Sequence, residues 1–370
     1  MIKHFDYLIV GSGLYGATIA HELVKAKKRV LVIEKRDHIG GNIYTENIDG
    51  INVHVYGAHI FHTSNKEVWD YVNSIVPFNH FINSPLAFYK GNLYHLPFNM
   101  YTFQQIFGVT EPEKAKAVIA KEIEKENIKD PKNLEEKALS LVGRTIYEKL
   151  IKGYTEKQWG QKATELPPFI IQRVPLRFEF NNNYFDDIYQ GIPIGGYTNL
   201  IKKLLIGAEV LTSTDFFKDR VRLEKIAEKI IYTGSIDEFF NYKLGALDYR
   251  SLRFETKRIA KEYYQNNCVI NYTEYQIPYT RIIEHKYFED ARTPFTIITK
   301  EYPDEYKAGK ERYYPINNDK NNNLYAEYNK LKATVPNVIF GGRLGNYKYY
   351  DMDDTILKAL EDAKNELKEG

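Results

Sequence analysis

The stretch Asp6-Tyr-Leu-Ile-Val-Gly-Ser-Gly-Leu-Tyr-Gly16 decides the fold class. An apolar strand pattern over residues 6–10 runs into three glycines spaced Gly-x-Gly-x-x-Gly, and a helical pattern covers residues 14–25. A second strand pattern follows over residues 29–34. This order of strand, glycine turn, helix and strand predicts the start of a Rossmann-type α/β domain.

The glycine turn suits a dinucleotide. Glycines at positions 11, 13 and 16 allow a tight turn and let backbone N–H groups approach a pyrophosphate at the start of the helix. Glu34, 18 residues after Gly16, offers a carboxylate to a ribose, and Gly40-Gly41 follow closely. The alternative is that these glycines only turn the chain. We expect a bound dinucleotide.

The middle of the chain has a helical pattern. Ser64 and Glu67 have the spacing of a capping box and predict a helix that starts there. From residue 102 to about 154, Pro112 is expected to open one helix and Asn133 to cap another. Three prolines at 167, 168 and 175 exclude a single helix over residues 165–180 and predict a loop.

Later segments return to strands. A helix is expected over 198–206, and strands over 209–211 and 229–232 are expected to rejoin the first sheet. Strand patterns at 249–254, 269–272, 279–285 and 296–299 predict a mixed or antiparallel sheet with one exposed face. A last strand over 338–340 and an amphipathic helix over 354–367 complete the chain.

These elements predict an α/β chain of three domains. Its length of 370 residues exceeds what one core usually organises. We expect a discontinuous Rossmann-type nucleotide-binding domain, a helical insertion domain, and an antiparallel-sheet substrate domain with a mobile loop at about 165–178. The Rossmann-type domain is expected to contain residues 1–77, 195–243 and 318–370. The helical domain is expected over residues 78–152, and the antiparallel-sheet domain over residues 153–194 and 244–317.

Composition excludes several classes of function. The chain has 51 basic and 49 acidic residues, and this balance argues against nucleic acids or anionic membranes as partners. No apolar run approaches the ~20 residues needed to span a membrane. The single cysteine, Cys268, cannot form an internal disulfide, so a cytoplasmic location is expected. His59-x-x-His62 lacks a matching third ligand, so no metal site is expected.

Six separated strings resemble bacterial UDP-galactopyranose mutases, and together they cover essentially the whole chain in the right order. They are Gly57-Ala-His-Ile-Phe-His-Thr63, Leu96-Pro-Phe-Asn-Met100, Gly153-Tyr-Thr-Glu-Lys-Gln-Trp159, Ile192-Pro-Ile-Gly-Gly-Tyr197, Tyr279-Thr-Arg-Ile-Ile-Glu-His285, and Gly341-Gly-Arg-Leu-Gly345 with Tyr349-Tyr-Asp-Met352. The Gly40-Gly41-Asn42 extension and the Gly341-Gly342-Arg343 segment also resemble flavoproteins related to amine oxidases, which favours FAD over NAD.

The resemblance implies an isomerase that interconverts UDP-galactopyranose and UDP-galactofuranose for cell-surface polysaccharide synthesis. It implies that N5 of reduced FAD attacks the anomeric carbon, UDP leaves, and the sugar opens and recloses as a five-membered ring. No protein nucleophile is needed, and the chain has no Gly-x-Ser-x-Gly elbow. NAD(P)H or another external reductant would keep the flavin reduced. A homodimer is one possible assembly.

The resemblance also implies roles for individual residues. Arg173 and Arg281 would bind the diphosphate, where arginine's planar fork suits the group, and His59 would lie beside the flavin. Further substrate contacts would be Asn83, Tyr154, Thr155, Trp159, Tyr184, Arg250, Asn271, Tyr314, Tyr347 and Tyr349. Cofactor contacts would be Gly11, Gly13, Tyr15, Gly16, Glu34, Lys35, Gly40, Gly41, Asn42, Gly57, His59, Ile60, Phe216, Phe217, Arg343, Tyr350, Asp351, Met352 and Ile356.

Each of these residues also has a plainer interpretation. An arginine can belong to a surface ion pair, and an aromatic residue can simply pack in the core. The chain departs from the family at Leu150 and Ile151, where relatives often carry aromatic residues beside the uracil. Two other functions compete: a flavin-dependent amine oxidase or desaturase, and a non-catalytic protein like the GDP-dissociation inhibitors. The two arginines and the uridine-binding segment favour a nucleotide sugar over the first, and the intact glycine fingerprint disfavours the second.

Overall fold

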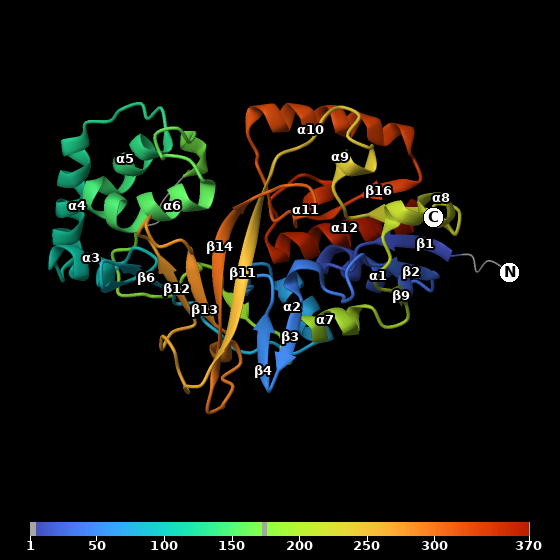
Figure 1. Ribbon diagram of the computed structural model, residues 1–370, viewed down its shortest axis with the longest axis horizontal. Coiled ribbons are helices and arrows are strands. Elements are labelled where there is room, and N and C mark those ends of the chain that lie inside the picture. Colours follow the sequence, from blue (N-terminus) through green and yellow to red (C-terminus); the bar gives the residue numbers. More distant parts are fainter. Residues whose placement is uncertain (1–4, 172–175, 370) are drawn as a thin grey trace. The chain divides into compact units, whose positions relative to one another are not determined.

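The computed structural model describes residues 5–171 and 176–369, and the chain forms two compact units (Figure 1). Unit 1 contains Met1–Phe81, Asp187–Ser251 and Tyr306–Gly370. Unit 2 contains Ile82–Asp186 and Leu252–Glu305. Each unit is therefore built from segments that are far apart in the sequence.

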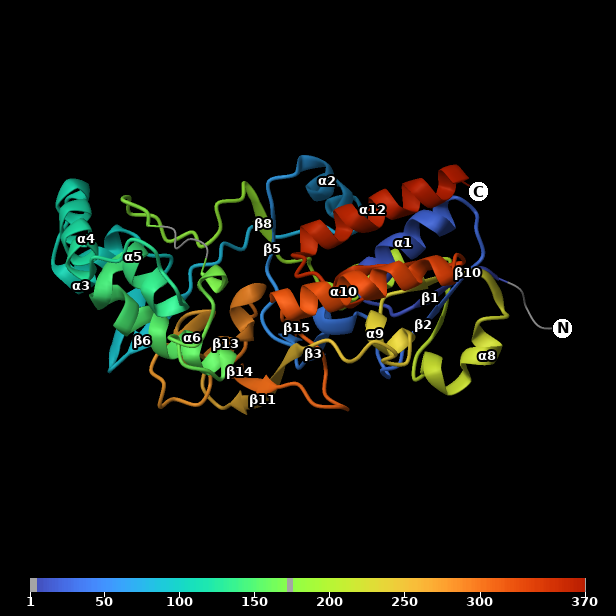
Figure 2. The ribbon, with the colours of Figure 1, turned by 90° about the horizontal axis from the view of Figure 1, so that it is seen from above.

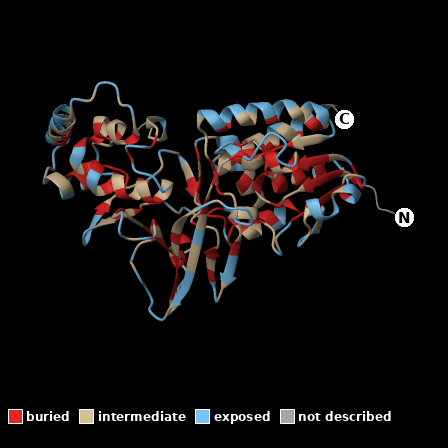
Figure 3. Cartoon of the chain, turned by 45° about the horizontal axis from the view of Figure 1, so that its top comes forward, coloured by how far each residue is buried: buried red, intermediate tan, exposed pale blue. Residues whose placement is uncertain are grey.

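Unit 1 is built on a five-stranded parallel sheet with the strand order β16-β10-β1-β2-β9. The strands are β1 (Phe5–Val10), β2 (Val30–Ile33), β9 (Glu209–Leu211), β10 (Ala227–Tyr232) and β16 (Val338–Phe340). All four residues of β2 are buried, as expected for a parallel sheet covered on both faces (Figure 3). The Rossmann-type start, and the later strands that rejoin it, are confirmed.

Helices cover both faces of this sheet. The helices α1 (Leu14–Lys25) and α12 (Met352–Glu369) lie side by side (Figure 2), and the Tyr7 hydroxyl on β1 donates to Glu366 Oε1 of α12 at 2.9 Å. Leu8 points to the other face because strand residues alternate. There it shares a core with Phe239 of α9 (Ile236–Phe239) and Tyr328 of α10 (Asp319–Leu331).

The smaller elements of unit 1 surround the sheet. The helices are α2 (Lys66–Ile75), α7 (Tyr197–Leu204), α8 (Arg220–Leu223) and α11 (Gly342–Gly345), with 3-10 turns at Gly41–Ile43, Phe216–Asp219 and Lys332–Thr334. The strands β3 (Thr45–Ile48) and β4 (Ile51–His54) form a hairpin, β5 (Phe61–Thr63) pairs with β8 (Tyr189–Gly191), and β15 (Tyr314–Pro315) pairs with the start of β11.

The predicted capping box at Ser64 is wrong by one residue. Asn65 caps α2, and its side-chain oxygen accepts from the backbone N–H groups of Glu67 at 2.9 Å and Val68 at 3.3 Å. The Ser64 hydroxyl donates instead to Asp187 Oδ1 at 2.6 Å. Asparagine can act as the N-cap because its side-chain oxygen reaches two of the free N–H groups at the start of the helix.

The helices of unit 2 run from residue 100 to residue 159. They are α3 (Met100–Phe107), α4 (Pro112–Glu126), α5 (Leu134–Ile146), a π-helix (Tyr147–Ile151) and α6 (Lys152–Trp159). Pro112 opens α4 and Asn133 caps α5 by accepting from Glu136 N at 2.9 Å, which confirms both predictions. Their apolar faces form one core that includes Phe103, Ile119 and Leu139.

A mixed sheet completes unit 2. Its strands are β6 (Leu86–Tyr89), β7 (Asn92–His95), β11 (Tyr249–Ile259), β12 (Val269–Tyr272), β13 (Arg281–Glu284) and β14 (Thr296–Glu305), in the order β11-β14-β13-β12-β6-β7. Strand β12 pairs parallel to β6 and antiparallel to β13. The β6–β7 hairpin lies within residues 78–152, which the sequence assigned to the helical domain; its turn at Lys90-Gly91 has positive φ at both residues.

Two further segments of unit 2 are short. Pro168–Ile170 and His285–Phe288 form 3-10 turns. The predicted mobile loop at about 165–178 includes residues 172–175, which lie outside the described residues, and so does Arg173. Within residues 5–171 and 176–369, no helix has both the length and the apolar character needed to cross a membrane.

Candidate active site

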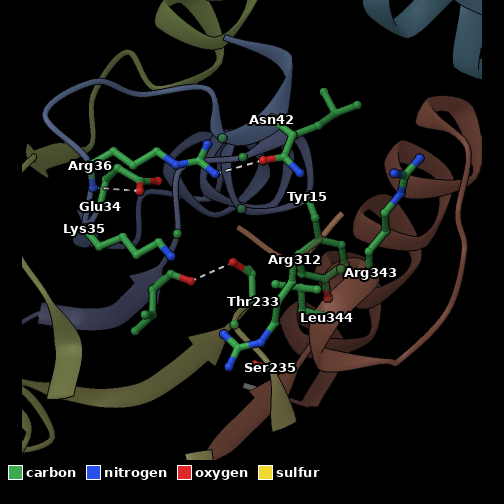
Figure 4. Close-up of a pocket in the computed structure, with 18 of the residues that line it drawn as sticks. Tyr15, Glu34, Lys35, Arg36, Asn42, Thr233, Ser235, Arg312, Arg343 and Leu344 are labelled. Carbon is green, nitrogen blue, oxygen red and sulfur yellow. Dashed lines mark hydrogen bonds between the residues drawn. The ribbon is translucent and has the colours of Figure 1, made fainter. Parts of the chain in front are cut away.

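A large pocket opens in unit 1 at the carboxyl ends of β1, β2 and β10 (Figure 4). Its volume, counted with the open mouth, is about 1410 Å³. Ligands of open α/β sheets bind in the crevice beyond the carboxyl ends of the strands, so the fold itself places this pocket. The walls come from the glycine turn, from the segment after β2, and from residues 214–217, 232–235, 311–313 and 342–344.

The three glycines of the turn lack a side chain for different structural reasons. A Cβ at Gly16 would lie 2.1 Å from the Gly11 carbonyl oxygen, and one at Gly11 would lie 2.1 Å from Thr233 Oγ1. Glycine is therefore required at both positions for packing within the chain. A Cβ at Gly13 would meet only Gly41 Cα, at 4.0 Å, and Gly13 lines the pocket. Its missing side chain leaves room for a ligand.

Glu34 ties the end of β2 to the glycine turn. Its Oε2 accepts from the Ser12 backbone N–H at 3.0 Å and from the Ser12 hydroxyl at 2.8 Å, and its Oε1 accepts from Arg36 N at 3.1 Å. The side chain is buried and lines the pocket. Each carboxylate oxygen has two lone pairs, so Glu34 retains the capacity to accept from a ribose hydroxyl.

Arg36 brings positive charge to the same wall. Its Nη2 donates to Asn42 Oδ1 at 2.9 Å (Figure 4). The same nitrogen donates to Glu311 Oε2 at 2.7 Å, and the guanidinium stacks on the Tyr56 ring at 4.5 Å. Its Nη1 is buried and has no hydrogen-bond partner among the described residues. Burying a hydrogen-bond donor without a partner costs free energy, so this nitrogen indicates that an anionic or polar ligand binds here.

A second arginine, Arg312, also lines the pocket. Arg312 donates from Nη1 to Glu238 Oε2 at 2.8 Å and from Nη2 to the Tyr242 hydroxyl at 3.0 Å. Its Nε is buried and has no partner in the described part of the chain. Burial acts to lower the pKa of Arg312, but Glu238 and the surrounding tyrosine hydroxyls together outweigh it and the pKa is raised, so the guanidinium is charged at any ordinary pH.

The pocket fits FAD. Helix α1 starts at its wall with Gly13 as N-cap, no side-chain cap and no acidic residue in the first turn, which leaves its N–H groups for a pyrophosphate. Fourteen of the predicted cofactor residues line it: Gly11, Gly13, Tyr15, Gly16, Glu34, Lys35, Gly40, Gly41, Asn42, His59, Phe216, Phe217, Arg343 and Met352. Those that do not are Gly57, Ile60, Tyr350, Asp351 and Ile356.

Several lining residues were not predicted from the sequence. They include Arg36, Thr214, Thr233, Ser235, Glu238, Glu311, Arg312, Tyr313, Leu344 and Thr355. One signal was available: Thr233-Gly234-Ser235 directly follow the strand pattern at 229–232, and the carboxyl ends of neighbouring parallel strands share one edge. Nothing local marks Glu311 or Arg312, which pair with residues far away in the sequence.

Helix α12 begins at the same pocket, where Met352 and Thr355 line the wall. A helix start at this position would favour the negative charge of a reduced flavin. However, Asp353 and Asp354 occupy the first turn, so acidic side chains partly offset the positive potential there. Burial raises the pKa of Asp351, which keeps more of this carboxyl neutral than usual.

His59 lines the pocket in a fixed tautomer. Its Nδ1 lies 2.8 Å from the Gly57 carbonyl oxygen. A carbonyl can only accept, so Nδ1 carries the proton and Nε2 is an acceptor in the neutral ring. The second histidine of the motif, His62, pairs instead with Asp187 through Nδ1 and Oδ2 at 2.6 Å. The two histidines therefore bind different partners, His59 the Gly57 carbonyl and His62 the Asp187 carboxylate.

Four predicted substrate residues lie in unit 1. Tyr314 and Tyr349 stack with ring centroids 5.3 Å apart, and the Arg343 guanidinium lies 4.7 Å from the Tyr349 ring. Arg250 is directly opposite Tyr314 across the β11–β15 pair. Tyr347 differs from these, because its ring is buried and its hydroxyl donates to the Asp248 carbonyl at 2.6 Å. The structure gives Tyr347 a packing role.

The predicted uridine-binding segment is helix α6 of unit 2. Thr155 is buried, and Tyr154 and Trp159 are half-buried. Leu150 and Ile151 end the π-helix and are buried in the helical core. Aliphatic side chains at these two positions therefore pack inside unit 2, and the aromatic faces available on this segment belong to Tyr154 and Trp159.

The hairpin β12–β13 brings together two other predicted residues. Asn271 and Arg281 are directly opposite each other in the register of the two strands. Arg281 donates from Nε to Glu301 Oε2 on β14 at 2.8 Å, and its Nη2 forms an ion pair with the same oxygen at 2.7 Å. Glu301 is buried, so the guanidinium is held by a carboxylate that water does not compete for.

Asn83 and Tyr184 are joined by a backbone bond, in which Tyr184 N donates to Asn83 O at 2.8 Å. The Asn83 side-chain oxygen is buried, with no hydrogen-bond partner in the regions 5–171 and 176–369. Arg177, which was not predicted, organises this loop by pairing with Asp186 at 2.6 Å and donating to the Tyr184 carbonyl at 3.2 Å. These contacts fix the backbone beside two predicted substrate residues.

Other kinds of site are not indicated. Among the described residues, no group of three His, Cys, Asp or Glu side chains is placed to hold a metal ion. Cys268 is buried just before β12, and burial raises the pKa of its thiol well above the usual range. The thiol is therefore a poor nucleophile.

Comparisons with known proteins agree with this geometry. A family model described as UDP-galactopyranose mutase matches residues 149–349, and one described as NAD(P)-binding Rossmann-like domain matches residues 9–75. A dTDP-fucopyranose mutase of Escherichia coli is 37% identical, with 98% of each chain covered. A probable UDP-galactopyranose mutase of Klebsiella pneumoniae is 38% identical, over 97% of this chain and 94% of the relative.

A solved structure of reduced UDP-galactopyranose mutase has the same fold. Its TM-score is 0.72 at 14% identity, and the match covers 99% of this chain and 94% of that structure. The resemblance seen in the six sequence strings and the predicted fold class are thereby confirmed. With a family match over more than half of the chain and relatives above 30% identity over nearly all of it, the chain belongs to the UDP-galactopyranose mutase family and is an isomerase.

Proposed function

We propose that the protein interconverts UDP-galactopyranose and UDP-galactofuranose with bound, reduced FAD. The observation that carries this proposal is the unit 1 pocket of a chain in this family. Its glycine turn leaves space at Gly13, and Arg36 presents a buried nitrogen without a partner among the described residues. Both features fit a dinucleotide diphosphate.

The proposed chemistry divides between cofactor and chain. Reduced FAD, when bound, supplies the nucleophilic nitrogen N5 for the anomeric carbon of the sugar. Arg281, oriented by Glu301, and Arg173 from the proline-flanked segment supply cations to the diphosphate, whose negative charge grows as UDP leaves. His59, with the proton on Nδ1, offers a polar group to the flavin pocket.

The pocket supports this division, because its walls, as far as the described residues show them, offer no activated nucleophile. The walls contain Ser235 and Thr233, but the Thr233 hydroxyl donates to the Val10 carbonyl at 2.8 Å. Neither the buried Cys268 nor a histidine paired with a serine is placed there among the described residues. Covalent work on the sugar is therefore assigned to the cofactor.

A second candidate function is the interconversion of dTDP-fucopyranose and dTDP-fucofuranose. It is favoured by the E. coli dTDP-fucopyranose mutase, whose 37% identity matches that of the K. pneumoniae relative closely. The two substrates differ by a thymine methyl group, a ribose hydroxyl and the sugar's 6-hydroxyl. A pocket discriminates such small changes by about 1–3 kcal/mol for a methyl group and more for an unmatched hydroxyl.

The deciding experiment measures both reactions on one preparation. Purified protein, reconstituted with FAD and reduced with dithionite, is incubated separately with UDP-galactofuranose and dTDP-fucofuranose, and the products are separated by chromatography. The proposal expects UDP-galactopyranose at the higher kcat/KM. Preference for the dTDP sugar would transfer the proposal to the second candidate. A role in cell-surface polysaccharide synthesis, an NAD(P)H-type reductant, a cytoplasmic location and a homodimer remain predictions.

A further inference from the structure

Lys157 of unit 2 is a buried lysine that the proposed reaction does not use. It lies on α6, is 8% exposed, and its ammonium donates to three backbone carbonyls: Tyr272 O at 2.6 Å, Ile277 O at 3.0 Å and Tyr279 O at 2.9 Å. An ammonium group has three N–H donors, and all three are used. The acceptors lie at both ends and within the loop that joins β12 to β13.

The surrounding contacts show that α6 and this loop meet closely. The Thr273 hydroxyl donates to the Lys149 carbonyl of the π-helix at 2.6 Å. A Cβ at Gly153 would lie 2.3 Å from the Thr273 carbonyl oxygen, so only glycine permits the approach. A π-turn inserted in a helix often marks a functional position, and here it leads directly into α6.

The two elements joined by Lys157 carry different parts of the predicted substrate site. Helix α6 carries Tyr154, three residues before Lys157, and Thr155. The hairpin carries Asn271 and Arg281, which are opposite each other and immediately flank the carbonyls that bind Lys157. The uridine and the diphosphate of one ligand would therefore be bound by two elements whose separation depends on this lysine.

We propose that Lys157 is a positioning residue: it fixes α6 against the β12–β13 hairpin, so that the affinity for the nucleoside diphosphate depends on its ammonium group. This inference rests on the proposed function, because it takes α6 and the hairpin as the nucleotide site. Lys157 acts through the residues it aligns and does not itself contact the ligand.

The charged groups around Lys157 define its pH dependence. Burial lowers the pKa of Lys157 to about 8, and the negative charge of Glu274 on the loop opposes this shift. The hydroxyls of Tyr272 and Tyr279 have raised pKa values, mainly through burial, and Lys300 of β14 lies 4.7 Å from the Tyr279 ring. Lys157 is therefore the group near this junction expected to lose its charge between about pH 7 and about pH 9.

Lys286 provides a matched control in the same unit. It is buried to a similar extent and donates to the carbonyls of Glu262 at 2.7 Å, Thr293 at 3.0 Å and Phe295 at 3.5 Å. These carbonyls belong to loops that carry none of the predicted substrate residues. Lys286→Met therefore removes an equivalent buried ammonium without touching the α6–hairpin junction.

The test measures binding of UDP and of dTDP to wild type, Lys157→Met and Lys286→Met by calorimetry, with FAD content and thermal midpoint as checks. We expect roughly tenfold weaker nucleotide binding in Lys157→Met, or about 1.4 kcal/mol, with KM raised more than kcat is lowered. Lys286→Met should bind as wild type does. Equal affinity in Lys157→Met and wild type, or equal losses in both variants, would overturn the inference.

A pH series covers the case in which Lys157→Met does not fold. Wild-type affinity for UDP should weaken from about pH 7 to about pH 9 as Lys157 loses its proton, whereas Lys157→Arg, which stays charged, should follow only the titration of the ligand. Parallel pH profiles for the two proteins would overturn the inference. Failure of wild type to bind either nucleotide would instead count against the proposed function.

Discussion

The guanidinium of Arg281 on β13 is bound by the carboxylate of Glu301 on the neighbouring strand β14, with both contacts shorter than 3 Å. The two residues are directly opposite in the strand register, and Glu301 is buried. Glu301 thus fixes one edge of the guanidinium and orients the group that the proposed reaction needs for the diphosphate. It also means that Arg281 contributes to stability as well as to function.

The first prediction separates these two contributions. Arg281→Ala should lower turnover by at least two orders of magnitude, about 3 kcal/mol in the barrier, and should also lower the thermal midpoint because Glu301 is left buried and unpaired. The double variant Arg281→Ala/Glu301→Gln should regain stability without regaining turnover. Steady-state kinetics and thermal melting check this. Recovery of turnover in the double variant would show that Arg281 acts only through stability.

The second prediction concerns Arg173, which is known only from the sequence. Arg173→Ala should lower turnover to a similar extent as Arg281→Ala, and lysine at either position should remain impaired because it loses the bidentate geometry. Because every described residue that lines the proposed flavin pocket belongs to unit 1, FAD content should not change in these variants. Near-normal turnover in both alanine variants with flavin bound would mean that the diphosphate is held by other residues.

The third prediction contrasts two glycines of the same turn. Gly13→Ala should fold, since its Cβ meets no atom of the described residues closer than 4.0 Å, but should bind FAD at least ~10-fold more weakly because the Cβ enters the ligand space. Gly16→Ala should fold poorly, since its Cβ would lie 2.1 Å from the Gly11 carbonyl oxygen. Soluble yield and flavin absorbance after reconstitution measure the two effects. Full FAD occupancy in Gly13→Ala would remove the turn from the cofactor site.

The fourth prediction follows from the Arg36–Glu311 pair. Burial acts to raise the pKa of Glu311, but the nearby charges and hydrogen bonds of Arg36 and Lys35 outweigh it, and the net pKa is lowered. A carboxyl whose pKa is lower in the folded chain stabilises the fold above the unfolded pKa of about 4.3 and loses this effect as pH falls through the folded value.

Glu311→Gln should therefore be less stable than wild type at neutral pH, and the difference in thermal midpoint should shrink on acidification below about pH 4. Glu327→Gln is a suitable control because Glu327 belongs to an exposed pair with Lys330 on α10. A difference for Glu311→Gln that stayed constant down to the lowest pH at which the protein folds would show that Arg36 does not depend on this carboxylate.

The sequence alone was enough to predict those parts of the fold and of the cofactor site that depend on residues close together in the chain. The β1–α1–β2 unit, with its glycines and Glu34, follows from local periodicity and from the steric needs of one turn. Arg312 could not be found in this way, because its pocket position depends on a pairing with Glu238 that only the folded chain creates.

Contacts between residues far apart in the sequence also explain why the β6–β7 hairpin and the role of Lys157 in unit 2 were not predicted. The hairpin at residues 86–95 joins its sheet through a parallel pairing of β6 with β12, strands separated by about half the chain. No local pattern encodes such a partner, and the short apolar strands are compatible with either secondary structure. Likewise, the sequence alone indicates an ordinary surface lysine at position 157. Only the folded chain shows that the carbonyls of the β12–β13 loop surround its ammonium group.

We propose that this chain isomerises a UDP-hexose with a reduced flavin that is not consumed. The most direct measurement incubates the yellow, FAD-loaded protein with UDP-galactofuranose under strict exclusion of oxygen, with and without one equivalent of dithionite, and follows product by chromatography. We expect many turnovers to UDP-galactopyranose per reduced flavin and none with oxidised flavin. Equal turnover with oxidised flavin, or no UDP-galactopyranose from fully reduced, FAD-loaded protein, would contradict it.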